Sequence, residues 1–397
     1  MANLSLVLSD LFPVNQHGTS PAHQCYTREK RMHSGDAPMP ANPSHELPLI
    51  TKSAAIRELM SLMDRCALGI ALVVDDQTRL EATITDGDVR RAILFGIELD
   101  QQVGALLATR KDCGRNARPI TAFAGTASRE LLRLMTEHRI RQIPLLDVED
   151  RVVDIALDSD YLANSALPLD GFIMAGGFGK RLMPLTEKCP KPMLPVNGRP
   201  ILEHMVCKLR AAGIQHVSIS THYMSESIVE HFHDGKDFGV HIEYVDEEQP
   251  MGTAGALAKA SLGDTPLLVV NGDILTSIDF RAMLEFHREH TADMTVAVRQ
   301  YDVRIPYGVI TTEGIDAIRI VEKPSFRHFV SAGIYLIQPS VCEMVPRHCA
   351  YDMPDLITSL IETHKHVICF PIREYWLDVG RMEEYERAST DTALGVV

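Results

Sequence analysis

Residues 172–196, FIMAGGFGKRLMPLTEKCPKPMLPV, are the stretch around which the rest of the chain is organised. The apolar run at residues 171–175 predicts a buried strand, and residues 176–179 follow it as a glycine-rich loop. Glycines let a backbone approach a phosphate closely, while Lys180 and Arg181 supply the charge that phosphate oxygens need. The stretch therefore predicts an anion site; a surface glycine turn with incidental basic residues is the alternative.

Two common phosphate-binding loops do not fit this stretch. A dinucleotide fingerprint requires a third glycine where Leu182 stands, and a P-loop requires glycine at Met174 and Ser or Thr at Arg181. A long helix cannot follow the loop, because proline recurs at Pro184, Pro190, Pro192 and Pro195. What remains is a strand, a glycine turn, a dibasic pair and a stiff loop ending in Lys191.

The composition of the chain limits the functions to consider. Its 397 residues leave room for two or three domains, and a formal net charge of −14 argues against non-specific nucleic-acid binding. The eight cysteines form no CxxC pair, so we expect reduced thiols. No apolar run reaches transmembrane length, and the first residues lack the basic segment of a signal peptide. We expect a cytoplasmic protein with no membrane or nucleic-acid partner.

The central stretch resembles the signature of the sugar-1-phosphate nucleotidyltransferases, also called nucleotide-sugar pyrophosphorylases. That signature reads approximately A-G-G-x-G-T-R-L-x-P-L-T, followed by P-K-P. The matching residues here are Ala175, Gly176, Gly177, Phe178, Gly179, Lys180, Arg181, Leu182, Met183, Pro184, Leu185 and Thr186, then Pro190, Lys191 and Pro192. The resemblance implies that the loop from Ala175 to Lys180 holds the triphosphate and that Arg181 and Lys191 are catalytic. Lys180 replaces the usual Thr and adds positive charge at the phosphates.

Residues 46–165 contain an internal repeat with an offset of 72. Arg57-Glu58-Leu59 matches Arg129-Glu130-Leu131, and the register holds without a gap. Each copy predicts helix, strand, turn, strand and helix, and two such small units should pack together. Residues 1–45 before the repeat are rich in Pro, His, Ser and Asn and predict a flexible extension.

The repeat is similar to a tandem CBS pair, a module that often binds adenine nucleotides. The similarity implies that Thr85 and Asp88 hold the ribose hydroxyls in the first copy. In the second copy Leu157 replaces the hydroxyl residue before Asp160, so at most one ribose site is expected. The alternative is a packing and dimerisation module without a ligand, and we expect a homo-oligomer in either case.

Residues 170–393 alternate between strand-like and helix-like runs, which predicts an α/β domain with a mainly parallel sheet and helices on both faces. The strand-like runs after the glycine loop are Val217–Ser220, Val240–Val245, Leu267–Val270, Met294–Val298 and Val309–Thr311. The family resemblance implies a Rossmann-like, GT-A-like nucleotidyltransferase sheet, here preceded by the α+β CBS pair. Ligands bind such sheets at the carboxyl ends of strands, which is where the glycine loop stands.

Two carboxylates are candidates for a magnesium site. Asp273 follows a buried strand, and Asp378 lies in a late Trp-Leu-Asp-Val-Gly run. Mg²⁺ at phosphate sites takes one or two carboxylates together with phosphate oxygens. Spacing alone leaves both residues open to a turn or capping role, and it is the resemblance that implies their pairing as metal ligands.

The resemblance also implies base and sugar contacts. The loop before an expected helix at Ala256–Ala260 supplies the candidates for the nucleobase, and three later motifs supply those for the sugar phosphate. The base candidates are Gln249, Gly252 and Thr253, and the sugar-phosphate candidates are Gly308, Glu322, Lys323 and Ser331. Ser331 stands where the family usually has Asn.

The expected reaction transfers a nucleotidyl group to a sugar 1-phosphate, giving a nucleotide-sugar and pyrophosphate. The Met251–Leu257 segment and the CBS fusion resemble the guanylyltransferase branch, which favours GTP over UTP, dTTP and CTP. That branch includes enzymes for mannose, heptose or glucosamine 1-phosphate in surface-polysaccharide or legionaminic-type sugar synthesis. The alternatives are a catalytically silent nucleotide sensor and a CBS-regulated enzyme with an unrelated phosphate substrate.

Overall fold

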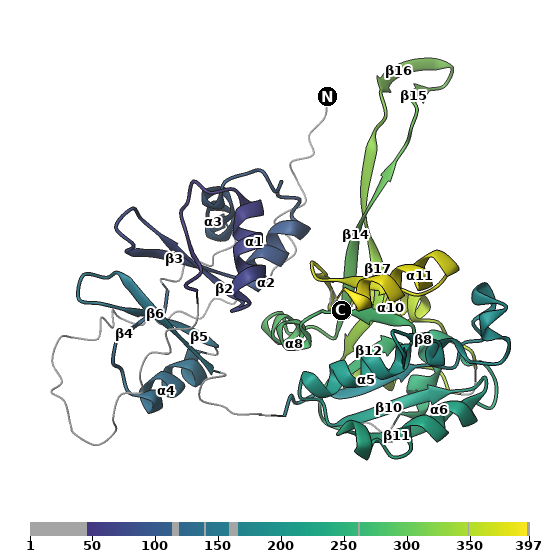
Figure 1. Ribbon diagram of the computed structural model, residues 1–397. Coiled ribbons are helices and arrows are strands. Elements are labelled where there is room, and N and C mark those ends of the chain that lie inside the picture. The colour runs from purple at the N-terminus through teal and green to yellow at the C-terminus, as the bar shows by residue number, and fades with distance from the viewer. Residues whose placement is uncertain are drawn as a thin grey trace. The chain divides into compact units, whose positions relative to one another are not determined.

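The computed structural model describes residues 46–112, 119–138, 140–158, 166–260, 263–347 and 349–394 (Figure 1). The expected extension, residues 1–45, lies outside the described residues. Within the described ranges, no helix combines the length and the apolar composition that crossing a membrane requires.

The two copies of the repeat have the same order of elements as far as the second copy is described, and its expected closing helix falls outside the described residues. The first copy comprises β1 (Leu49–Ile50), α1 (Ile56–Cys66), β2 (Ile70–Val74), β3 (Leu80–Thr85) and α2 (Asp86–Leu94), and α3 (Val103–Asp112) follows it. The second copy comprises β4 (Ala122–Phe123), α4 (Ser128–His138), β5 (Gln142–Leu146) and β6 (Val152–Leu157). The bounds of α4, β5 and β6 are those of α1, β2 and β3 moved by 72 residues, which confirms the repeat and its gapless register.

The two copies pack against each other, as predicted. The backbone N–H of Leu80 donates to the carbonyl of Asp150 over 3.2 Å, and the equivalent N–H of Val152 donates to the carbonyl of Thr78 over 3.0 Å. A shared apolar cluster takes residues from both copies, among them Leu72 and Ile155. Each copy thus buries the apolar face that it could not cover alone.

A seven-stranded sheet forms the centre of the second part of the chain (Figure 1). Its order is β11 (His241–Asp246), β10 (His216–Thr221), β7 (Asp170–Met174), β12 (Leu267–Asn271), β17 (Ser325–Ile337), β14 (Met294–Arg304) and β18 (Val367–Pro371). Only β17 runs antiparallel to its neighbours, so the prediction of a mainly parallel sheet is confirmed.

Helices cover both faces of the sheet, as predicted. One apolar cluster gathers α5 (Ile201–Ala211), α6 (Ser225–Phe232) and α8 (Phe280–Glu289), and another gathers α7 (Gly252–Gly255), α9 (Pro339–Cys342) and α10 (Met353–Glu362). Within β7, Ile173 enters the first cluster and Phe172 the second, and both are fully buried. Alternation along the strand therefore gives β7 two apolar faces, each side chain stabilising the fold by about 1.5–3 kcal/mol.

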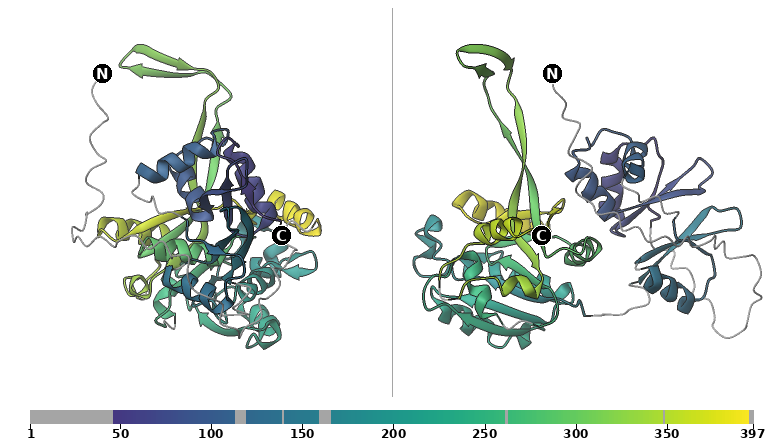
Figure 2. Two further views of the ribbon diagram at one scale, coloured as in Figure 1. Left: turned by 90° about the vertical axis from the view of Figure 1, so that its left-hand side faces the viewer. Right: turned by 180° about the vertical axis from the view of Figure 1, so that it is seen from behind.

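The strands β14 and β17 continue past the sheet as a two-stranded arm (Figures 1 and 2). The arm carries β15 (Val309–Glu313) and β16 (Asp316–Val321) at its tip, and most of its side chains are exposed. Four two- or three-residue strands and a last helix complete the described strands and α-helices. They are β8 (Pro195–Val196) paired with β9 (Arg199–Pro200), β13 (Ile274–Thr276) paired with β19 (Trp376–Asp378), and α11 (Met382–Ala393).

Candidate active site

The glycine loop leaves the carboxyl end of β7 between two neighbouring strands. The N–H of Ala175 donates to the carbonyl of Ser220 over 3.0 Å, and the carbonyl of Met174 accepts from the N–H of Gly272 over 2.9 Å. Hydrogen bonds to the carboxyl ends of the two neighbouring strands therefore fix the position at which the loop begins. This is the strand edge at which α/β sheets bind ligands.

Two glycines of the loop have no room for a side chain. Gly179 has φ +62°, and a Cβ there would lie 2.9 Å from Cγ2 of Thr186 and 3.0 Å from Cβ of Lys191. A Cβ on Gly176 would lie 2.8 Å from Oε1 of Glu247, whereas one on Gly177 would meet nothing within 4 Å. Gly179 therefore packs closely against the segment that follows the loop, and Gly176 packs against Glu247. Gly177 between them has open space beside it.

Glu247 was not found from the sequence. It is buried beside Gly176, and its Oε2 accepts from the N–H of Met251 over 3.0 Å. Its carbonyl contacts Nδ1 of His222 at 2.6 Å. The carboxylate thus ties the glycine loop to the Gln249–Gly252 loop, and a Glu following a strand gave no signal that could have identified this role.

The proline-rich continuation forms three short 3₁₀ turns at Lys180–Leu182, Leu185–Glu187 and Lys191–Met193. The prediction that no long helix follows the loop is therefore confirmed. The last turn places Lys191 inside the protein, where the residue is only 8% exposed. A buried lysine needs a partner of opposite charge, because removing an ammonium group from water is costly.

That partner is the pair of carboxylates. In the β13–β19 ribbon, Ile274 lies opposite Asp378, and the N–H of Val379 donates to the carbonyl of Asp273 over 3.0 Å. The ammonium of Lys191 forms an ion pair with Oδ2 of Asp273 and lies 3.9 Å from Oδ1 of Asp378. The structure thus brings together three residues from distant parts of the chain.

The carboxylate pair has the character of a cation site. Burial, and then the charge of Asp273, raise the pKa of Asp378, although Lys191 and Arg181 oppose the rise. Oδ1 of Asp273 and Oδ1 of Asp378 are buried and lack a hydrogen-bond partner among the described residues. Carboxylate oxygens left over in this way fit Mg²⁺. The described residues contain no group of three or more metal-ligating side chains, so further ligands would have to come from phosphate and water.

Arg181 lies near Asp378. A Cβ on Gly380 would be 3.5 Å from Oδ1 of Asp378, 3.5 Å from Oε2 of Glu384 and 3.7 Å from Nη1 of Arg181. Oε2 of Glu384 is also buried and without a hydrogen-bond partner in the described chain. A cavity of about 420 Å³ adjoins this corner and is lined by Arg181, Arg381, Met382 and Glu383. The sequence pattern of α11, with its many charged residues, gave no sign that Glu384 belongs here.

The base candidates form a separate loop. Gly252 has φ +77°, and a Cβ there would lie 2.7 Å from the carbonyl oxygen of Tyr351. The N–H and hydroxyl of Thr253 donate to Oδ1 of Asp352 over 2.9 and 3.2 Å, and the hydroxyl accepts from the N–H of Met353 over 2.8 Å. Thr253 thus anchors the start of α10, while Gln249 is exposed.

The helix expected at Ala256–Ala260 is present as a short 3₁₀ helix, and an α-helical turn that was not expected precedes it. The α-helical turn spans Gly252–Gly255, and Ala256–Lys259 is a 3₁₀ helix. The N–H groups of Ala254 and Gly255 both donate to the carbonyl of Tyr351, so contacts with a distant segment fix the turn earlier than local pattern indicated.

Three of the four sugar-phosphate candidates lie on the arm. Gly308, Glu322 and Lys323 adjoin the β15–β16 hairpin, and Glu322 and Lys323 have side chains 70% and 66% exposed that lie 4.0 Å apart. Ser331 lies at the base of the arm, with its hydroxyl 2.9 Å from that of Tyr335. The extended chain of β17 runs from Ser325, two residues after Lys323, to Ser331, which corresponds to about 20 Å. The structure therefore does not gather these four residues, because the β14–β17 ladder continues straight beyond the sheet.

The CBS ligand candidates contact each other. The N–H and hydroxyl of Thr85 each donate to Oδ2 of Asp88 over 2.9 Å, and Asp88 returns its N–H to the Thr85 hydroxyl over 3.4 Å. The two residues form the capping box that begins α2. Asp88 is 5% exposed and forms an ion pair with Arg91 at 2.6 Å. Asp160 of the second copy lies outside the described residues.

The protein has an α/β fold with a mainly parallel sheet. One strand edge of this sheet carries a glycine loop, a buried lysine and two carboxylates, an arrangement suited to binding phosphates. Residues 170–394 match the family described as nucleotidyl transferase, and residues 43–95 match the CBS domain. The chain therefore belongs to the nucleotidyl transferase family and carries a CBS domain.

The chain is similar to several mannose-1-phosphate guanylyltransferases. It is 34% identical over 238 residues to the mannose-1-phosphate guanylyltransferase of Mycobacterium tuberculosis, covering 57% of this chain and 66% of that protein. It is 32% identical over 229 residues to the mannose-1-phosphate guanyltransferase of Candida albicans, covering 55% and 62%. The chain thus spans less than two thirds of the length of these relatives. Among solved structures, HddC from Yersinia pseudotuberculosis is 24% identical with a TM-score of 0.46, covering 56% of this chain and 99% of that one.

Proposed function

We propose that the protein transfers GMP from GTP to a sugar 1-phosphate, giving a GDP-sugar and pyrophosphate. The observation that carries this proposal is the buried Lys191, placed between Asp273 and Asp378 at the strand edge that also bears the glycine loop. The choice of GTP over UTP, dTTP or CTP is supported by the similarity to mannose-1-phosphate guanylyltransferases. The sugar, the surface-polysaccharide or nonulosonic pathway, a homo-oligomer and a cytoplasmic location are further parts of the proposal.

In the proposed reaction, an oxygen of the sugar phosphate attacks the α-phosphorus of the triphosphate in line. A new P–O bond forms to the sugar phosphate, the bond to the β-phosphate oxygen breaks, and pyrophosphate leaves with the electron pair. No protein nucleophile is required, so the protein contributes positioning and charge neutralisation. Both can be assigned to groups at the strand edge.

Each group has a distinct part. Backbone N–H groups around Gly177, the open position of the loop, would hold triphosphate oxygens, and Arg181 would neutralise the leaving pyrophosphate. The ammonium of Lys191 would contact the α-phosphate and the attacking phosphate. Asp273 and Asp378 would hold Mg²⁺, which supplies positive charge to the phosphate oxygens when bound. Before substrate binds, Asp273 holds Lys191 through Oδ2 and leaves its Oδ1 free.

The test is pyrophosphate release by the full chain with Mg²⁺, four nucleoside triphosphates and a panel of sugar 1-phosphates. Release with GTP and one sugar would support reaction, base and substrate together. Release with another triphosphate would retain the reaction and overturn the choice of GTP. A folded protein that releases no pyrophosphate with any pair would contradict the proposal and favour a nucleotide sensor.

A further inference from the structure

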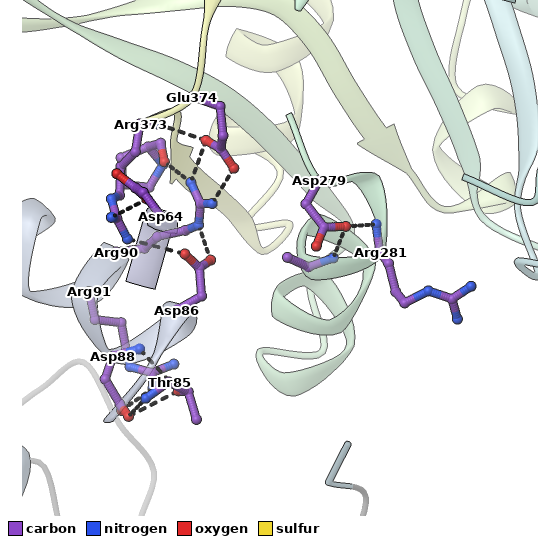
Figure 3. A network of polar contacts seen from close by, with 12 residues as sticks. Asp64, Thr85, Asp86, Asp88, Arg90, Arg91, Asp279, Arg281, Arg373 and Glu374 are labelled. Carbon is purple, nitrogen blue, oxygen red and sulfur yellow. Dashed lines mark hydrogen bonds and ion pairs between the residues drawn. The ribbon is translucent and has the colours of Figure 1, made fainter. Parts of the chain in front are cut away.

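The helix α2 of the first CBS repeat places an arginine against residues 370–374 of the nucleotidyl transferase part of the chain, residues 170–394, which we call the catalytic domain (Figure 3). Arg90 is 1% exposed, and its guanidinium donates to Asp86 on the same helix and to the carbonyl of Pro371. It also donates to the Glu374 carboxylate, over 2.7 Å to Oε1 and 3.4 Å to Oε2. The same guanidinium stacks on the ring of Phe370, with Cζ 3.9 Å from the ring centroid. Every face of this buried cation thus has a partner, and most of those partners belong to residues 370–374.

A second arginine extends the same network in the opposite direction. Arg373, whose side chain is 6% exposed, donates to Asp86 over 3.3 Å and to Asp64 of α1 over 3.0 Å. Asp86 is therefore shared between Arg90 of its own helix and Arg373 of the catalytic domain. Charges of alternating sign run from Asp64 through Arg373, Asp86 and Arg90 to Glu374, as Figure 3 shows.

The electrostatics of Glu374 show that this contact is favourable. Burial would raise its pKa, but the charge and hydrogen bonds of Arg90, together with the backbone N–H groups of Glu374 and Arg373, outweigh burial and lower it. A buried ion pair of this kind is worth little against an apolar pair, but removing one partner is strongly destabilising because the other charge stays buried. The position of Glu374 is thus coupled to the presence of Arg90.

Glu374 lies two residues before β19, the strand that carries Asp378. The carbonyl of the intervening Tyr375 accepts from the N–H of Ser277 over 3.0 Å and from the hydroxyl of Thr276 over 2.9 Å. From there β19 pairs with β13 and places Asp378 opposite Ile274, next to Asp273. Only three residues separate Glu374 from Asp378, and two of them, Trp376 and Leu377, are in register with β13. A displacement of Glu374 should therefore be transmitted to the carboxylate.

The ligand candidates of the first repeat are engaged by the same helix. Asp88 pairs with Arg91, and Arg91 in turn pairs with Glu289 of α8 at 2.8 Å. Together with Arg90–Glu374 and Arg373–Asp86, this gives α2 three ionic contacts with the catalytic domain. The described contacts of α2 thus favour a role in positioning segments of the catalytic domain.

We propose that Arg90 is a positioning residue for the active site: by holding Glu374, it fixes β19 so that Asp378 stays beside Asp273. The inference rests on the proposed function only in taking these two carboxylates as the metal pair. It assigns to the CBS repeat a part of the catalytic architecture itself, independent of any nucleotide that the repeat binds. Loss of Arg90 should loosen the metal site while the glycine loop remains intact.

The test measures metal binding and the environment of β19 in the full chain. Trp376 lies within β19 and is the sole tryptophan of the protein, so its fluorescence reports on this strand alone. Mn²⁺ replaces Mg²⁺ as the probe, and its dissociation constant follows from the electron paramagnetic resonance signal of the free ion. The variants are Arg90→Gln, Arg90→Lys and Glu374→Gln, with Arg57→Gln as control, because Arg57 forms only an exposed ion pair with Asp100 in the same repeat.

Arg90→Gln and Glu374→Gln should each raise the Mn²⁺ dissociation constant about fivefold or more and shift the Trp376 emission. Arg90→Lys should fall between them and the wild type, since lysine keeps the charge but loses the fork. Arg57→Gln should change neither readout. A folded Arg90→Gln protein that binds Mn²⁺ within twofold of the wild type would overturn the inference, and so would a wild type that binds no Mn²⁺. If Arg90→Gln does not fold, Arg90→Lys and Glu374→Gln decide by the same criteria. Failure of the proposed function is distinguishable, because it appears as absent pyrophosphate release from a wild type that binds Mn²⁺ normally.

Discussion

Removal of the Lys191 charge is the perturbation that bears most directly on the proposed site. Lys191→Met keeps most of the side-chain volume and removes the ammonium that lies between Asp273 and Asp378. At 3.9 Å the attraction between Lys191 and Asp378 lies between about 1 kcal/mol in water and about 4 kcal/mol at an effective dielectric constant of about 20, because the Asp378 side chain is 45% exposed and partly screened. The same charge would face the reacting phosphates, where loss of one preorganised group typically costs on the order of 3 kcal/mol in the barrier. We therefore expect the turnover number to fall by about a hundredfold or more.

The assay is steady-state pyrophosphate release at saturating Mg²⁺, with circular dichroism to verify folding. Lys188→Met is the matched control, because Lys188 belongs to the same proline-rich segment and is exposed. The control should retain the wild-type turnover number. A folded Lys191→Met protein that keeps more than a third of that number would refute the reasoning, because the ammonium of Lys191 could not then be stabilising the reacting phosphates in the transition state.

Three other predictions concern pH and backbone geometry. Burial and the charge of Asp273 raise the pKa of Asp378, so this carboxylate should become protonated, and bind Mg²⁺ more weakly, at a pH above the usual aspartate range. The Mg²⁺ concentration that gives half-maximal activity should therefore rise as the pH falls. The Asp378→Asn variant should lose this pH dependence. Burial lowers the pKa of His287 to about 4, so the unfolded state binds the extra proton below pH 6.5; the unfolding free energy attributable to His287 should be about 2 kcal/mol lower at pH 5 than at pH 7.5. Denaturant titrations at both pH values measure the unfolding free energy of the wild type and of His287→Gln. A difference between the two proteins that is the same at both pH values would contradict this prediction. Gly179→Ala should lower the unfolding free energy by about 2 kcal/mol through its left-handed backbone and the contact with Thr186, whereas Gly177→Ala should change it by less than about 0.5 kcal/mol; equal effects on thermal unfolding would count against the loop geometry.

Much of the fold was predictable from local pattern. The offset of the repeat fixed the bounds of α4, β5 and β6 from those of the first copy, because each copy buries the same apolar positions. The buried strand before the glycine loop and the absence of a long helix after it were both confirmed, since apolar runs and prolines act over a few residues.

What the sequence could not supply depends on contacts between distant segments. Asp273 and Asp378 meet only because β13 pairs with β19, and nothing in either segment specifies that partner. The α-helical turn at Gly252–Gly255 depends on hydrogen bonds to Tyr351, about 100 residues further along the chain. The Val309–Thr311 run was correctly expected as a strand, but its alternation gives no sign that it lies exposed at the tip of an arm. Arg90 resembles any other helical arginine until Glu374 is placed beside it.

The pairing of β13 with β19 also bears on how the active site comes into existence during synthesis. The glycine loop, Lys191 and Asp273 all precede the arm in the chain, whereas Asp378 lies after β18, the last strand of the sheet. A growing chain could therefore form the phosphate-binding edge while still lacking the second carboxylate. The metal pair, and with it the anchor at Glu374, would be assembled last. Nascent or truncated chains would then bind phosphates without being able to turn them over.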